Sequence, residues 1–200
     1  MVVLAGGGQP QQHQACAAAE QFRFPLVAKG VTPDILHKTE AGLVVLNISD
    51  ISELRNSWGE IERRIKEHGA TVHFRGILLE KMLPPPLLEV IVGAVYDAPF
   101  HKIMFGLGGI WVEVLKDTST RLAPLDAADA EEMLTEIKAA KLLTGLRGRP
   151  AADREALIKA LLAVSAMVSD LSDVIAEVDL NPLMVYPQGV CSVDALISLK

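Results

Sequence analysis

The oxygen-bearing side chains near the C-terminus are the residues of this sequence best suited to chemistry. Glu177, Asp179 and Asn181 alternate along a predicted strand, so they share one face of it. Pro187-Gln188-Gly189 predicts a turn, and counting back across it places Asp194 opposite Asn181 to within about two residues. Such a cluster suits Mg²⁺, which takes one or two carboxylates and leaves positions for water and substrate phosphates. The alternative is the solvated face of an edge hairpin.

Three further side chains fit the chemistry of a phosphate site. Lys29 ends a predicted buried strand and could direct its ammonium group at a phosphate, although such lysines more often reach into water. His37 lies in a polar loop beside Lys38, where a neutral imidazole could attack phosphorus; a surface histidine is the alternative. Glu113 follows a glycine loop and could be a third metal-site carboxylate, or an ordinary surface glutamate.

The glycine loop, residues 106–109, does not match a dinucleotide fingerprint. It lacks the six-position spacing and leads into a predicted strand rather than a helix, and the sequence has no Walker motif. The loop is therefore either a plain turn or a place where the backbone approaches a ligand. Arg147 and Arg149 suit an anionic ligand or a partner chain, or are solvated.

Composition predicts a soluble, cytoplasmic α/β protein. The chain has 200 residues, 50% of them hydrophobic, and no uncharged apolar run near the roughly 18 residues that a membrane span needs. The net charge of −6 and the lack of a basic cluster argue against a nucleic-acid partner. Cys16 and Cys191 lack metal-ligand spacing and are expected to be reduced thiols.

Hydrophobic periodicity and chain breakers predict the elements that position these residues. Residues 51–67 predict an amphipathic helix that begins with a capping box at Asp50–Glu53. Pro84-Pro85-Pro86 cannot continue a sheet and predicts a lobe boundary, and Asn181-Pro182 predicts a break in the hydrogen-bond ladder, after which apolar residues resume at Leu183. Residues 1–14 are predicted to be disordered. The other predicted strands are 25–29, 43–48, 76–83, 87–96, 102–105 and 110–115, and the other predicted helices lie near 14–21, 126–143 and 153–171.

A series of motifs connects these segments to a known family. In chain order they are PLVAKGVTPDILHKTEAGLVVLNI, ILLEKM, LEVIVGAVYDAPF, FGLGGIWVEVLKD, LLTGLRGRP, EVDLNPLMV and VDALISL. From about Ala15 to the C-terminus, the series resembles the ATP-grasp subunit of NDP-forming acyl-CoA synthetases, which are relatives of the succinyl-CoA synthetase β chain. The resemblance implies an α+β ATP-grasp fold of two lobes with nucleotide between them. Residues 15–84 would form a small lobe that is truncated at its N-terminal side, and residues 85–200 the large lobe.

The resemblance also implies roles in binding ATP or ADP. Lys29 is similar to the phosphate-contacting lysine of the small lobe. Glu80, Lys81 and Met82 occupy the hinge strand that holds adenine, and Glu89 is similar to a glutamate close to the nucleotide. Lys81 stands where relatives commonly have an acid.

The same resemblance assigns the phosphoryl chemistry. Asn181 and Asp194 match the pair that binds Mg²⁺ with the ATP phosphates, with Glu113 nearby, and His37 matches a histidine of a phosphoryl relay. The family's usual Gly-Gly is Gly42-Leu43 here, and the leucine is expected to stiffen or obstruct that loop. The CoA-binding and ligase domains would come from another polypeptide in a hetero-oligomer.

Two other functions remain open. The chain could be a non-catalytic module that binds nucleotide or a partner chain without turnover. It could instead belong to another ATP-grasp carboxylate ligase that passes through an acyl phosphate, in which case His37 is not needed.

Overall fold

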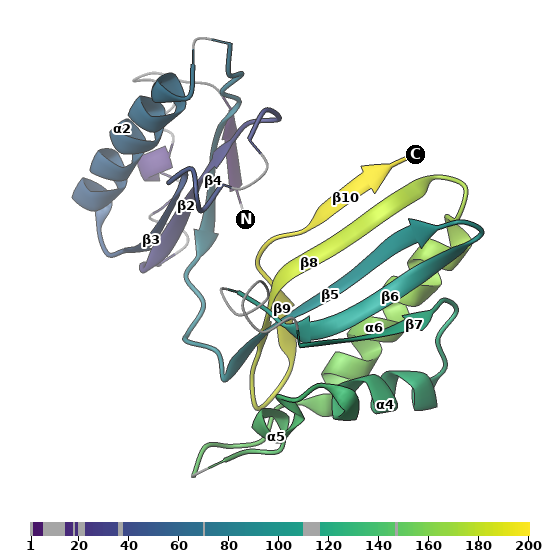
Figure 1. Cartoon of the computed structure of the whole chain (residues 1–200). Helices are drawn as coiled ribbons and strands as arrows, with labels where there is room; N and C mark the ends of the chain where they lie inside the picture. Colours follow the sequence, from purple (N-terminus) through teal and green to yellow (C-terminus); the bar gives the residue numbers. More distant parts are fainter. Residues whose placement is uncertain are drawn as a thin grey trace. The chain divides into compact units, whose positions relative to one another are not determined.

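The computed structural model describes residues 2–5, 15–17, 19, 23–35, 38–69, 71–109, 117–146 and 148–200. The chain divides into two compact units, Met1–Pro84 and Pro85–Lys200, and the division falls inside the run of three prolines. Each unit contains one antiparallel sheet and its own helices, so the fold is α+β as predicted (Figure 1). Among the described residues, no helix combines the length and apolarity that crossing a membrane requires.

The first unit packs one long helix against a four-stranded sheet of order β1-β4-β2-β3. Its elements are β1 (Val2–Ala5), β2 (Leu26–Val31), β3 (Val44–Ile48), α2 (Ile51–Glu67) and β4 (Gly76–Lys81). The helix has the predicted bounds because its apolar residues recur every three or four positions. Four of them, Leu54, Trp58, Ile61 and Ile65, are buried against the sheet.

The predicted disorder of residues 1–14 is wrong for Val2–Ala5. These four residues form β1, which pairs antiparallel with β4 from Val2 opposite Leu79 to Ala5 opposite Gly76. A run of four apolar residues has no periodicity of its own that sequence reasoning can use. The strand forms because a distant segment supplies its hydrogen-bond partners.

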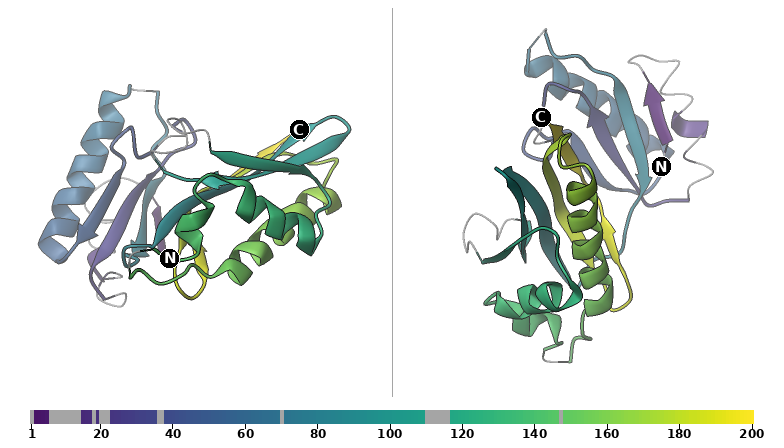
Figure 2. Two further views of the ribbon diagram at one scale, coloured as in Figure 1. Left: turned by 60° about the horizontal axis from the view of Figure 1, so that its bottom comes forward. Right: turned by 90° about the vertical axis from the view of Figure 1, so that its right-hand side faces the viewer.

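The second unit has one sheet of order β10-β8-β5-β6-β7, with β9 also paired to β8. Its strands are β5 (Leu88–Asp97), β6 (Phe100–Leu107), β7 (Thr118–Leu122), β8 (Ile175–Val185), β9 (Val190–Ser192) and β10 (Leu196–Leu199), and its helices are α4 (Ala127–Glu136), α5 (Ala140–Leu143) and α6 (Arg154–Asp170). Helices α4 and α6 lie on the same face of this sheet (Figure 2). The apolar side chains of that face and of the two helices form the core of the unit.

Two predictions about the middle of this unit need correction. Thr118–Leu122 form an edge strand that was not expected, since its polar sequence lacks an apolar face. The helix predicted near 126–143 is two helices. Helix α4 ends where Ile137 has an extended backbone, and in the segment before α5 the buried Asp117 carboxylate accepts the backbone N–H groups of Lys138 (2.7 Å) and Ala139 (2.8 Å). The predicted strand 110–115 lies outside the described residues.

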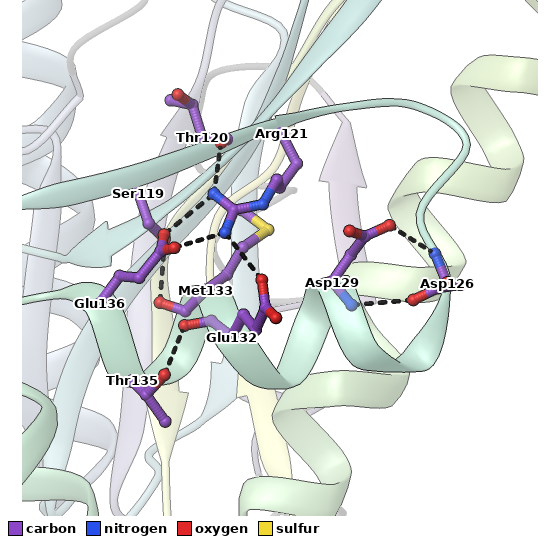
Figure 3. Close-up of polar contacts among 9 residues, drawn as sticks. All are labelled: Ser119, Thr120, Arg121, Asp126, Asp129, Glu132, Met133, Thr135 and Glu136. Atoms are coloured by element: carbon purple, nitrogen blue, oxygen red, sulfur yellow. Dashed lines mark hydrogen bonds and ion pairs between the residues drawn. The ribbon is translucent and has the colours of Figure 1, made fainter.

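Polar contacts fix α4 to the edge strand β7 (Figure 3). The Arg121 guanidinium donates to Glu136 (2.9 Å) and to Glu132 (3.2 Å), and the buried Ser119 hydroxyl donates to the Met133 carbonyl oxygen (2.9 Å). Hydrogen bonds from Arg121 lower the pKa of the Glu136 carboxyl. These contacts replace the apolar packing that the polar strand cannot provide.

The predicted break in the hydrogen-bond ladder at Asn181-Pro182 is confirmed, because the pairing of β8 with β5 passes from Leu180 to Leu183 without these two residues. Strand β8 continues to Val185, and its pairing with β5 shifts register between Val90 and Val92. The proline therefore lies at an irregularity in the ladder, where its missing N–H is tolerated. The strand stays continuous on both sides of Asn181.

Asp153 links the start of α6 to the turn between β8 and β9. Its carboxylate accepts the backbone N–H of Gly189 (2.7 Å) and that of Ala156 (3.0 Å), and its own N–H donates to Tyr186 (3.0 Å). The Gly189 hydrogen bond is the main cause that lowers the Asp153 pKa. Asp153 therefore stabilises both the helix start and the hairpin turn.

We expect Asp153→Asn to lower the Tm at pH 7 by about 2–4 °C, because the carboxamide keeps one acceptor oxygen and loses the charge and one of the two hydrogen bonds to Ala156 and Gly189. A lowered folded pKa means that the carboxylate stabilises the fold above the unfolded pKa, and that this contribution disappears as pH falls through the folded value. The Tm difference should therefore shrink below about pH 4. Thermal unfolding followed by circular dichroism measures it, with exposed Asp173→Asn as control. A constant difference down to pH 2 would contradict the assignment.

Candidate functional site

In the first unit, Lys29 and Glu80 lie on the sheet face that α2 leaves uncovered. Their neighbours Ala28 and Leu79 are buried on the helix side, so strand alternation turns both charged side chains the other way. Lys29 Nζ is 2.5 Å from Glu80 Oε2, and the side chains are 15% and 29% exposed. Two residues predicted to bind nucleotide thus meet as a half-buried ion pair. An incoming phosphate would have to compete with this carboxylate for the ammonium group.

The rest of the predicted hinge extends from this ion pair. Lys81 is exposed and pairs with Leu26, and the Met82 N–H donates to the Pro25 carbonyl oxygen (3.0 Å). The Met82 N–H is therefore used within the protein. An adenine bound here would contact other groups of the strand or replace this hydrogen bond.

The predicted phosphoryl-relay residue, His37, lies outside the described residues, but both flanks of its loop are held in place. On one side the Asp34 carboxylate accepts the His73 N–H (2.6 Å) and lies 3.1 Å from His73 Nδ1. The His73 backbone N–H is the largest cause that lowers the pKa of Asp34. On the other side, Arg64 of α2 donates to the Gly42 carbonyl oxygen. The loop is thus anchored to a neighbouring segment and to the helix.

Leu43 does not obstruct this loop, contrary to the expectation from Gly42-Leu43. Its side chain is 0% exposed and belongs to the core of the first unit. Its carbonyl oxygen accepts the Gly30 N–H (2.7 Å) at the start of the strand pairing. A leucine is accepted here because its side chain points into the core and away from the loop.

In the second unit, Asn181 and Asp194 lie between two stretches of strand pairing. The pairings on either side of them are Leu183 with Ser192 and Asp179 with Leu196. Both have the same register, which continued through residues 193–195 aligns Asp194 with Asn181 along the chain; Asp194 is exposed, and its Oδ1 accepts the Ala195 N–H (3.0 Å). Val178 is buried while Glu177, Asp179 and Asn181 are half-buried on the helix-free face, as the alternation predicts. The hairpin register therefore agrees with the position predicted from the turn.

The glycine loop lies against Glu89 and Asn181. The Gly108 N–H donates to the Glu89 carbonyl oxygen (2.9 Å), and a Cβ at Gly108 would lie 2.6 Å from the backbone of Val90. Gly109 has a φ of +61°, and a Cβ there would lie 2.4 Å from Glu89 Oε2. The Gly109 N–H makes a long contact of 3.4 Å with Asn181 Oδ1. The loop is thus more than a plain turn, because it joins Glu89 to Asn181.

The donors in this corner fit a magnesium ion that also binds phosphate. Among the described residues, no three His, Cys, Asp or Glu side chains gather as a metal cage. Mg²⁺ does not need one, since it uses one or two carboxylates and takes its other ligands from water and phosphates. Asn181 and Asp194 would supply such a partial set if the predicted metal site forms here. Glu113, the predicted third carboxylate, lies outside the described residues.

Other candidates have different surroundings. His101, predicted to be structural, is 3% exposed, and its Nε2 lies 3.0 Å from the Ile175 carbonyl oxygen. Arg149 is exposed and Arg147 lies outside the described residues.

Sequence reasoning missed the Lys29–Glu80 ion pair and the contact from Gly109 to Asn181. Strand alternation could have suggested the ion pair, but nothing in the sequence signalled the glycine contact.

The chain is similar to proteins of one family. Residues 8–199 match the ATP-grasp domain family. The β subunit of acetate–CoA ligase [ADP-forming] II from Pyrococcus furiosus is 45% identical over 190 residues, covering 94% of this chain and 80% of that one. The Ca. Korarchaeum cryptofilum dinucleotide-forming acetyl-coenzyme A synthetase 1, solved with coenzyme A, Ca-AMPCP and HgCl⁺, superposes with a TM-score of 0.91 at 38% identity, covering 100% of this chain and 85% of that one.

A second structure of that synthetase was solved with coenzyme A and Mg-AMPPCP, its phosphohistidine segment pointing towards the nucleotide-binding site. The match has a TM-score of 0.80 at 38% identity and covers 94% of this chain and 83% of the synthetase chain.

Proposed function

This chain belongs to the ATP-grasp domain family, and from that premise we propose that it is the nucleotide-binding subunit of an ADP-forming acyl-CoA synthetase of the acetate–CoA ligase type. Its part of the reaction would be phosphoryl transfer between ATP or ADP and a histidine. The named relatives, an ADP-forming acetate–CoA ligase β subunit and a synthetase solved with Mg-AMPPCP, support this reaction class.

The observation that carries the proposal is the register of the C-terminal hairpin. Continued between the two paired stretches, this register supports a position of Asp194 opposite Asn181, whose carboxamide the Gly109 N–H faces. These two side chains would hold Mg²⁺, which when bound neutralises charge on the phosphates. Carboxamide and carboxylate oxygens at one point of a sheet serve this purpose without a complete protein cage.

Residues of the first unit would bind the nucleotide itself. Lys29 would exchange its contact with Glu80 for a phosphate oxygen, which compensates the loss of the ion pair with another charge-assisted contact. Glu80, Lys81 and Met82 would contact the adenine. The released Glu80 carboxylate would then be free to accept a hydrogen bond from the ligand.

In the transfer step, an imidazole nitrogen of His37 would attack the γ-phosphorus of ATP. The bond from phosphorus to the β,γ-bridging oxygen breaks, a phosphorus–nitrogen bond forms, and ADP leaves with the electron pair. The reverse step makes ATP from phosphohistidine and ADP. The segments before and after position 37 are anchored through Asp34 and through Arg64.

A partner chain would complete the reaction. The Pyrococcus relative is named a β subunit, which supports an assembly with a second kind of subunit. We propose that this partner binds CoA and carries the acyl-transfer chemistry, so that the two chains form a hetero-oligomer. The carboxylic acid would then be selected by the partner.

Labelling with [γ-³²P]ATP tests the function. The purified chain, mixed with Mg²⁺ and with the CoA-ligase subunit of a related enzyme, should acquire a phosphate that is stable in base and lost in acid, as a phosphorus–nitrogen bond requires. Omitting Mg²⁺ should prevent the labelling. Tight Mg-ATP binding by calorimetry without any label on either chain would instead support the non-catalytic module.

A further inference from the structure

Glu89 is attached to the glycine loop through both its backbone and its side chain. Its carbonyl oxygen accepts the Gly108 N–H (2.9 Å). Its carboxylate lies in the space that a side chain at position 109 would fill, since a Cβ there would come within 2.4 Å of Oε2. The positive φ of Gly109, +61°, also favours glycine at this position. The half-buried carboxylate therefore depends on the absence of a side chain at Gly109.

The backbone N–H of Gly109 faces Asn181, one of the two predicted metal ligands. The Gly109 N–H points at Asn181 Oδ1 over 3.4 Å, so this contact identifies the carboxamide oxygen, and not the amino group, as the atom turned toward the loop. An N–H donor uses one lone pair of that oxygen and leaves the second for a cation. Displacing the loop would remove the group that orients the carboxamide.

We propose that Glu89 and Gly109 are positioning residues for the metal site. The Glu89 side chain packs in the space left by the missing side chain of Gly109 and holds the loop in place. The Gly109 N–H can then orient the Asn181 carboxamide oxygen toward Mg²⁺. This inference rests on the proposed function. It assigns Glu89 a different role from the direct nucleotide contact that the family resemblance implies. Partners that orient a metal ligand typically contribute about 10–100-fold to metal affinity.

The two roles of Glu89 differ in their dependence on metal. A residue that contacts the nucleotide affects ADP affinity whether or not Mg²⁺ is present. A residue that orients a metal ligand affects only the additional affinity that Mg²⁺ provides. Calorimetric titration of the full chain with ADP, in EDTA and across a series of Mg²⁺ concentrations, separates the two contributions.

We expect Glu89→Ala to leave the Kd for ADP in EDTA unchanged and to raise the half-saturating Mg²⁺ concentration about 10–100-fold. Glu89→Gln occupies the same space and should stay close to the wild-type protein. A metal-free Kd for ADP that rises as much as the metal-dependent one would overturn the proposal in favour of direct nucleotide contact. A loss in Glu89→Gln equal to that in Glu89→Ala would also overturn it, because a metal-ligand role needs the charge.

Gly109→Ala should reproduce the effect of Glu89→Ala, and the double variant should be no worse than Gly109→Ala alone, because both changes act through one contact. The matched control is Gly148→Ala, which has a similar positive φ of +83° but open space around its Cβ position. If Gly109→Ala does not fold, as circular dichroism would reveal, Glu89→Ala carries the test.

The same titrations distinguish failure of this inference from failure of the proposed function. If the wild-type protein binds ADP with no dependence on Mg²⁺, both are contradicted. If the Mg²⁺ dependence of ADP binding is unaltered in both variants, this inference alone is overturned.

Discussion

The double substitution Asn181→Ala with Asp194→Ala is expected to lower Mg²⁺-dependent phosphoryl transfer by at least about 10²–10³-fold, the effect of removing a preorganised electrostatic group. The register on either side of these two residues supports their sharing one cation under the proposed function. Without them, Mg²⁺ would lose both oxygen ligands that this hairpin is proposed to supply. The charge that develops on the γ-phosphoryl group would then lose its fixed counter-charge.

The rate of histidine labelling from [γ-³²P]ATP, measured over a range of Mg²⁺ concentrations, quantifies this loss. Excess Mg²⁺ should restore little of it, because the missing groups place the cation and do not merely attract it. Gln188→Ala is the control, since Gln188 is an exposed residue in the turn of the same hairpin. Full activity of the double variant would remove the metal assignment from this hairpin.

The substitution His37→Ala is expected to abolish the acid-labile phosphate on this chain while leaving Mg-nucleotide binding intact. Alanine lacks the nitrogen that forms the phosphorus–nitrogen bond, so the loss of label should be complete. The core of the first unit should be unaffected, because it is built from α2 and the strands around it. Gel separation of the two subunits after labelling shows which chain carries the phosphate.

His68→Ala provides the comparison for this experiment, since His68 is an exposed histidine at the end of α2. It should be labelled like the wild-type protein. Retained turnover in His37→Ala, with acyl phosphate as the detectable intermediate, would favour the carboxylate-ligase alternative. Retained labelling on this chain would move the acceptor to another histidine.

Local patterns predicted the helices of this protein well. The bounds of α2 agree with the prediction because its apolar residues and its Asp50 cap lie within one segment. The helix α6, Arg154–Asp170, differs by about one residue at each end from the prediction for the same reason. The prediction failed where a distant group intervenes: the Asp117 carboxylate binds the backbone of Lys138 and Ala139, between the two helices that were predicted as one.

The prediction of strands depended more on the neighbouring strands with which they pair. The apolar strands β2, β4 and β5 were predicted because buried strands are continuous apolar runs. Strands β1 and β7 were not, since the first is only four residues long and the second is polar. Their hydrogen-bond partners lie far along the chain or on the neighbouring edge, and no local pattern encodes such pairing.

The sequence by itself determined the kind of chemistry and the hairpin register. The residue types at Asn181 and Asp194, with a turn between two strands, predicted that one lies opposite the other, and the pairings of Leu183 with Ser192 and of Asp179 with Leu196 on either side are in agreement with that count. The order of the motifs indicated the family, because a series of matches in the same order is specific. These features depend on nearby residues or on simple counting along the chain.

Only the tertiary structure decided how the side chains of the candidate site are paired. The Lys29–Glu80 ion pair joins residues from two strands that are distant in sequence. The contact of Gly109 with both Glu89 and Asn181 depends on the path of a loop across three strands. The physical reason is that such contacts arise from packing at a few ångströms, where the absence of a single Cβ decides which side chain can enter, and sequence spacing carries no information at that scale.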